Sequence, residues 1–191
     1  TTCGSVLNVW KNVTRYAREG FTAVIHGKVK HEETQATASQ ALKTPGGRYL
    51  VVLDRGEALE VCDYIRHGGD AAAFMARFGK AASDGFDPDH DLGRVGVANQ
   101  TTMLMSESLE IADLLRDAMR DRYGEDALAD RFRAFDTICS ATQERQDAVI
   151  SLLAEQSIDL MLVVGGYNSS NTCNLARICA GRCDHLVNRH A

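Results

Sequence analysis

The stretch FTAVIHGKVKHEET (residues 21–34) contains the pattern that decides the fold. Its first five residues form an apolar run typical of a buried strand, and a polar loop then leads into a helical pattern over residues 32–42. Similar apolar runs lie at 49–53, 94–98 and 160–164. Helical periodicity of about 3.6 residues surrounds them, at residues 6–16, 58–67, 71–78, 109–123, 143–156 and 175–180. This alternation predicts the α/β class, with small parallel sheets flanked by helices.

The composition is that of a folded protein. Of the 191 residues, 45% are hydrophobic, 25% are charged and only two are Pro, which excludes a disordered or collagen-like chain. No apolar run approaches the roughly 20 residues that a membrane helix needs. The formal net charge of −5 argues against a nucleic-acid binder. We therefore expect neither nucleic acid nor a membrane among the partners.

Both ends suggest a segment of a longer protein. Residue 1 is Thr rather than Met, and residues 184–187 have the pattern of a strand that begins just before the chain stops. A charged stretch near residues 124–138 separates two parts of the chain. We place the domains at residues 1–135 and 136–191.

Two of the six cysteines, Cys3 and Cys139, share a local design in which a Thr precedes the cysteine and a small residue and a helical pattern follow. A thiolate at a helix N-terminus is stabilised by free N–H groups, which suits a metal ligand or a nucleophile equally well. A buried structural cysteine is the alternative. The repeated context favours ligands, since iron–sulfur clusters can take thiolates from distant parts of a chain.

The cysteines as a group are too irregularly spaced for a disulfide scaffold in a chain with this apolar content. A reducing cytosol is the expected setting. We expect the remaining four to pack as small apolar side chains: Cys62, Cys173, Cys179 and Cys183.

The loop after the first apolar run carries two histidines, His26 and His31, together with two lysines and two glutamates. The carboxyl ends of parallel strands are where α/β proteins bind ligands. These side chains could bind an anion and move a proton. A solvated charged loop is the alternative.

Two later loops also follow apolar runs. Thr101 and Thr102 come after the run at 94–98, where a hydroxyl can cap a helix or bind a substrate. The segment GGYNSSNT (residues 165–172) combines two glycines with small polar side chains at the start of a helix. Free N–H groups at a helix start bind anions, typically phosphate. The segment lacks the Gly-Lys-Ser/Thr of a Walker loop, and phosphate binding is favoured over plain capping.

Taken together, five segments resemble one family, 4-hydroxy-3-methylbut-2-enyl diphosphate reductase of the non-mevalonate isoprenoid pathway. They occur in the family's order and span nearly the whole chain. The amino-acid sequences of two of these segments are more similar to the plant and cyanobacterial branch of the family than to the enterobacterial one. The segments are TTCGSV (1–6), HGKVKHEET (26–34), ANQTTML (98–104), DTICSATQERQ (136–146) and VGGYNSSNT (164–172).

The resemblance implies a 4Fe–4S cluster held by three cysteines, with one iron open to the substrate. Two of the three match Cys3 and Cys139, and the third is expected upstream of residue 1. The family's three α/β units surround the cluster. Residues 1–135 would be the middle unit, opening with the end of the first, and residues 136–191 an incomplete third unit.

The resemblance also implies the remaining roles. Glu33 matches the family's proton-delivering glutamate, and His31 and Thr101 match active-site residues. The substrate would be bound by His31, Thr101, Ser169, Ser170 and Asn171. Electrons would come from a donor such as ferredoxin or flavodoxin. The products would be isopentenyl and dimethylallyl diphosphate, and the protein would work in the bacterial cytosol, with the plastid stroma as an alternative.

Two other functions remain open at this point. One is a phosphate-binding α/β domain without redox chemistry, in which the cysteines only pack. The other is a thiol-nucleophile enzyme that uses Cys3 or Cys139 with His31. With two of three cluster thiolates, we expect this segment by itself to be inactive.

Overall fold

The computed structural model describes residues 3–135, 140–166, 169–180 and 184–190. The chain forms two compact units. Unit 1 comprises Thr1–Gln100 and Ser106–Thr137, and unit 2 comprises Thr101–Met105 and Ile138–Ala191.

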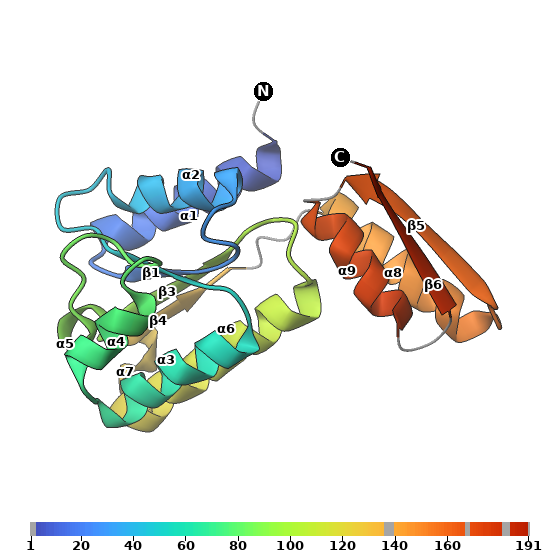
Figure 1. Cartoon of the computed structure of the whole chain (residues 1–191). Helices are drawn as coiled ribbons and strands as arrows, with labels where there is room; N and C mark the ends of the chain where they lie inside the picture. Colours follow the sequence, from blue (N-terminus) through green and yellow to red (C-terminus); the bar gives the residue numbers. More distant parts are fainter. Residues whose placement is uncertain (1–2, 136–139, 167–168, 181–183, 191) are drawn as a thin grey trace. The chain divides into compact units, whose positions relative to one another are not determined.

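Unit 1 is built on a four-stranded sheet in the order β2-β1-β3-β4, with every neighbouring pair parallel (Figure 1). In register, His26 at the end of β1 pairs with Asn99 at the end of β3. The elements of the unit are α1 (Gly4–Arg18), β1 (Thr22–His26), α2 (Glu32–Ala41), β2 (Tyr49–Val52), α3 (Arg55–His67), α4 (Ala71–Phe78), α5 (Pro88–Asp91), β3 (Val95–Asn99), α6 (Met105–Tyr123), α7 (Glu125–Arg131) and β4 (Phe132–Ala134).

Helices cover both faces of this sheet. Successive strand residues point to opposite faces, so Ala23 and Ile25 of β1 join one apolar cluster while Val24 joins another. The first cluster contains Val9 and Val13 of α1 with residues of α2, and the second is built from α3, α4 and α6. Figure 1 shows α1 and α2 on one side of the sheet and α3 and α6 on the other. Burial on both faces explains why the strands are continuous apolar runs.

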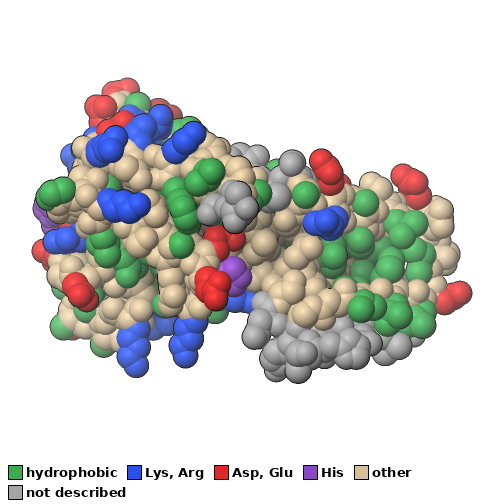
Figure 2. All heavy atoms as spheres, turned by 90° about the horizontal axis from the view of Figure 1, so that it is seen from above, with side chains coloured by type: hydrophobic (Ala, Val, Ile, Leu, Met, Phe, Trp, Pro, Cys, Tyr) green, Lys and Arg blue, Asp and Glu red, His purple; other side chains and the backbone are tan. Residues whose placement is uncertain are grey.

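Unit 2 contains α8 (Ser140–Glu155), β5 (Leu160–Gly166), α9 (Ser170–Ala180) and β6 (Asp184–His190), and β5 and β6 pair in parallel. Helix α9 packs against both strands. Leu160, Leu162 and Val164 on alternate positions of β5 are exposed by 54%, 60% and 63%. Figure 2 shows hydrophobic side chains gathered on the surface of this smaller unit.

The predicted α/β class and the four predicted strands are confirmed, each within about two residues of its expected bounds. Three short elements were not predicted: α5, α7 and β4. Helix α7 has no buried residue and β4 has only three residues, so neither leaves a clear periodic pattern. None of the helices in the described part of the chain is long and apolar enough to cross a membrane.

The cysteines expected to pack are found largely as predicted. Cys62 and Cys179 are fully buried, and Cys173 is half-buried. Burial raises the pKa of the Cys62 thiol to about 11, which keeps it protonated and unreactive. Cys183 lies outside the described residues.

Candidate functional site

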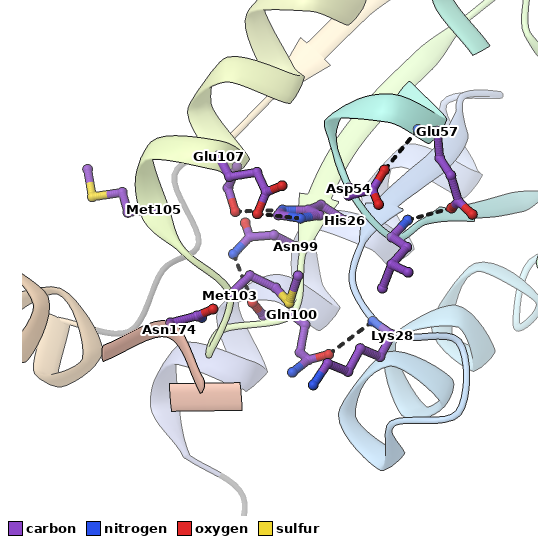
Figure 3. A network of polar contacts seen from close by, with 12 residues as sticks. His26, Lys28, Asp54, Glu57, Asn99, Gln100, Met103, Met105, Glu107 and Asn174 are labelled. Atoms are coloured by element: carbon purple, nitrogen blue, oxygen red, sulfur yellow. Dashed lines mark hydrogen bonds and ion pairs between the residues drawn. The ribbon is translucent and has the colours of Figure 1, made fainter. Parts of the chain in front are cut away.

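The carboxyl ends of β1 and β3 are joined by the side chain of Gln100. This side chain is fully buried, and its Oε1 accepts a hydrogen bond from the Lys28 backbone N–H at 3.2 Å (Figure 3). The same atom accepts a second hydrogen bond, from the Thr34 hydroxyl at 3.1 Å. Gly27 lies against the same group, since a Cβ there would come within 2.8 Å of the Thr34 Oγ1. One residue at the end of β3 therefore holds the loop that follows β1.

That loop ends at His31, which caps helix α2. Its Nδ1 accepts a hydrogen bond from the Glu33 backbone N–H at 3.2 Å. The other ring nitrogen, Nε2, can therefore bind a second group. His31 and Glu33 are half-buried, whereas Glu32 is exposed. Both carboxylates lie in the first turn of α2, where the helix dipole stabilises negative charge.

His26 lies beneath the loop in a buried polar cluster. Its Nδ1 is 2.8 Å from the Ser108 hydroxyl, and its Nε2 is 4.0 Å from a Glu107 carboxylate oxygen (Figure 3). Burial lowers the pKa of His26 to about 4, against smaller opposing effects of the Leu53 backbone and the Asp54 carboxylate. The imidazole is therefore neutral at physiological pH, and His26 is a structural residue of this end of the sheet.

Thr101 is buried, and the segment that it begins belongs to unit 2. Asn174 of α9 donates to the Thr102 carbonyl at 3.0 Å. Gln146 of α8 donates to the Met103 carbonyl and accepts from the Met105 N–H, both at 3.4 Å. Two helices therefore hold this five-residue segment through its backbone.

The predicted phosphate-binding residues lie at the start of α9 in unit 2. The Ser169 hydroxyl accepts from the Thr172 N–H at 3.2 Å and thus caps the helix, while Ser170 is buried in the first turn. The Asn171 Oδ1 is buried without a hydrogen-bond partner among the described residues. Buried polar atoms in folded proteins normally have partners, so this amide is a candidate for contact with a ligand.

Cys3 directly precedes α1 and occupies its N-cap position. Its side chain is exposed and makes no capping hydrogen bond. An exposed thiol beside free helix N–H groups has the chemistry of a metal ligand. Cys139 lies outside the described residues. In the described ranges, no three His, Cys, Asp or Glu side chains form a group that could hold a metal ion.

Three of the predicted site residues thus belong to unit 1, namely Cys3, His31 and Glu33. The other described ones, Thr101 and the Ser169–Asn171 turn, belong to unit 2. The residues that hold these loops were not predicted: Gln100, Gln146 and Asn174. Gln146 and Asn174 lie in polar stretches of α8 and α9, so the sequence offered no signal that singled them out.

Comparison with known proteins places the chain in one family. The LytB protein family matches the chain over residues 1–191. The chain belongs to the LytB family. Two curated relatives, both named 4-hydroxy-3-methylbut-2-enyl diphosphate reductase, are 57% identical: that of Gloeobacter violaceus over 95% of this chain and that of Thermosynechococcus vestitus over 93%. The predicted family and its cyanobacterial-like branch are confirmed.

This LytB chain spans 42% and 43% of the length of those two relatives. Its fold matches a solved structure of E-1-hydroxy-2-methyl-but-2-enyl-4-diphosphate reductase from Plasmodium falciparum, with a TM-score of 0.65 and 20% identity over 97% of this chain and 46% of the other. A solved (E)-4-hydroxy-3-methyl-but-2-enyl diphosphate reductase matches with a TM-score of 0.51 and 24% identity, over 98% of this chain and 53% of that one. At these identities the two structures support the fold.

Proposed function

We propose that this chain is part of a 4-hydroxy-3-methylbut-2-enyl diphosphate reductase. The observation that carries the proposal is the 57% identity over 95% of the chain to a relative with that name. The reaction removes an allylic hydroxyl: the alcohol takes up two electrons and two protons, the C–O bond breaks, water leaves and a C–H bond forms. The product is isopentenyl or dimethylallyl diphosphate.

The proposed cofactor is a 4Fe–4S cluster held by Cys3, Cys139 and a third cysteine from outside this chain. The exposed thiol of Cys3 at the start of α1 fits such a ligand, whereas the buried Cys62 and Cys179 do not. When bound, the cluster supplies electrons and a Lewis-acid iron for the substrate hydroxyl. Residues 1–135 would form the middle unit of the complete protein and residues 136–191 part of its third.

Glu33 is the proposed proton donor of this site. Its half-buried carboxyl lies in the first turn of α2, and His31 is fixed beside it by the capping hydrogen bond. In this proposal Glu33 delivers the proton that lets water leave, Thr101 relays it and His31 binds the substrate through its free ring nitrogen. The hydrogen bonds of Gln100 would keep the loop in one conformation while the proton moves.

The turn at the start of α9 is the proposed binding site for the diphosphate. Ser169, Ser170 and Asn171 present small polar groups beside helix N–H groups, which favour anions. If the side-chain amide of Asn171 is flipped, so that Nδ2 and Oδ1 exchange positions, its N–H donors point where the unpartnered Oδ1 now lies. A diphosphate fixed there would orient the reacting end of the substrate.

The electron donor in this proposal is a small one-electron carrier protein such as ferredoxin or flavodoxin. The bacterial cytosol is the proposed location, in keeping with the cyanobacterial sources of the relatives.

The test compares two neighbouring carboxylates in the complete protein, purified without oxygen and assayed with reduced methyl viologen as electron source. Glu33→Gln keeps the shape but removes the proton, so kcat should fall by about 10²- to 10⁴-fold. Glu32→Gln is the matched control, because Glu32 lies in the same helical turn but is exposed, and its kcat should stay within about twofold.

Iron and acid-labile sulfide are measured on the same samples. Equal loss in both glutamate variants would contradict the role of Glu33. A wild-type protein without iron, or one that binds the diphosphate but does not reduce it, would overturn the proposed function in favour of a phosphate-binding domain. Full cluster occupancy in residues 1–191 expressed alone would show that the ligands have been misassigned.

A further inference from the structure

Three of the five lysines of the chain, Lys28, Lys30 and Lys80, border one cavity of about 560 Å³ in unit 1. Lys28 and Lys30 come from the loop after β1, and Lys80 follows α4 some fifty residues later in the chain. The gathering of these charges is therefore a product of the tertiary structure. It contrasts with the formal net charge of −5 of the whole chain.

The charges of the three lysines are not compensated within the described part of unit 1, where none of them forms an ion pair. A fourth cation at the cavity, Arg77, is different. It lies 3.1 Å from a Glu57 carboxylate oxygen and 3.3 Å from one of Glu60. The lysine rim thus keeps its positive charge, whereas the charge of Arg77 is matched by its two glutamates.

The wall between these charges is apolar. Val29 is 38% exposed and Leu53 is 43% exposed, and both line the cavity. Phe78 and Ala81 complete the apolar lining. An exposed apolar hollow bordered by three lysines, with Glu57 paired to Arg77, has the anatomy of a protein interface, with an apolar centre and a polar rim.

The cavity adjoins the loop that leads into α2, whose first turn contains the proposed proton donor. Lys30 directly precedes His31 and lies three residues before Glu33, and the Lys28 backbone is held by Gln100. Figure 3 shows Lys28 beside Gln100 at this end of the sheet. A protein bound at the cavity would therefore contact the loop that leads into the proposed site.

We propose that this cavity, with its rim of Lys28, Lys30 and Lys80, is the docking surface for a small acidic one-electron carrier protein of the ferredoxin type. The inference rests on the proposed function, which consumes two electrons from an external donor. Each encounter would oxidise one reduced carrier by one electron, so two encounters serve one turnover. The uncompensated positive charge selects an acidic partner, and a small apolar centre suits the weak, transient contacts of redox proteins.

The experiment uses the complete holoenzyme with a reduced, acidic 2Fe–2S ferredoxin as donor, at low ionic strength. The triple variant Lys28→Glu, Lys30→Glu and Lys80→Glu should raise the KM for ferredoxin by at least about tenfold. The control is Lys11→Glu with Lys43→Glu, two exposed lysines away from the cavity, for which the KM for ferredoxin should change less than about twofold. The difference should shrink in about 0.5 M salt, because salt screens exposed charges.

Assays with reduced methyl viologen separate the docking surface from the chemistry. Lys80 lines the cavity but lies outside the loop of His31, so Lys80→Glu alone should raise the KM for ferredoxin while kcat with viologen and the KM for the diphosphate substrate match those of the wild type. An unchanged KM for ferredoxin, or a raised KM for the diphosphate, would overturn the docking proposal. A wild-type holoenzyme that is inactive even with viologen would instead contradict the proposed function.

The apolar part of the surface is tested by Leu53→Ser, which leaves every charge in place. We expect it to raise the KM for ferredoxin by about threefold or more at both low and high salt, since apolar contacts are not screened. An effect confined to low salt, or no effect, would contradict the assigned apolar centre.

Discussion

The sheets of the two units differ in how deeply they are buried. Strands β1 and β3 of unit 1 are buried at every position, whereas only Val163 is buried among the seven residues of β5 in unit 2. Yet β5 is as apolar in sequence as β1. An apolar run therefore indicates that a strand can be buried on both faces of its sheet. Whether both faces are buried depends on the helices that pack against the sheet.

The largest contrast should appear when one leucine is truncated in each unit. Leu50 of β2 is fully buried in the larger apolar cluster, so Leu50→Ala should lower the free energy of unfolding of unit 1 by about 2–5 kcal/mol. Leu162→Ala should change that of unit 2 by less than about 0.5 kcal/mol, because its side chain is already 60% exposed. Native-state hydrogen exchange reports the two units separately. Similar losses in both units would break the comparison.

Acid should weaken unit 1 through His26. Its pKa is about 4 in the folded protein and about 6.5 when unfolded, so the unfolded state binds the extra proton. The stabilisation is complete above about pH 6.5 and is lost as the pH falls towards 4, by about 3 kcal/mol in all. The measurement is the exchange of unit 1 amides at several pH values. His26→Gln should remove this part of the pH dependence, and the exposed His67→Gln should keep it.

The smallest predicted effect concerns the covered side of unit 2. A Cβ at Gly165 would collide with the Thr172 side chain of α9, so Gly165→Ala should destabilise unit 2 by about 1–3 kcal/mol. Gly166→Ala is the matched control, since nothing lies within 4 Å of its Cβ position. Thermal unfolding followed by circular dichroism compares the two. Equal stability would mean that α9 packs loosely on β5 and would sharpen the contrast with unit 1.

Much of the fold was predictable because strands and long helices leave local patterns. The apolar runs at 21–25 and 49–53 predicted β1 and β2. The motifs around Cys3, His31 and Ser169 each lie at the start of a helix. The part of the site that could not be predicted consists of long-range contacts. The bond from Lys28 to Gln100 spans 72 residues, and no periodicity encodes which loop a buried amide will hold.

The sequence by itself determined the α/β class, the family and the residues that resemble its functional positions, because these depend on local periodicity and on ordered motifs. Only the tertiary structure decided that Gln100 holds the loop that leads to His31 and Glu33. It also decided that Thr101 belongs to the same unit as α8 and α9. It also decided that Lys80 joins Lys28 and Lys30 around one cavity. The physical reason is that each of these contacts joins residues far apart in the chain, whose meeting depends on how helices pack on a sheet.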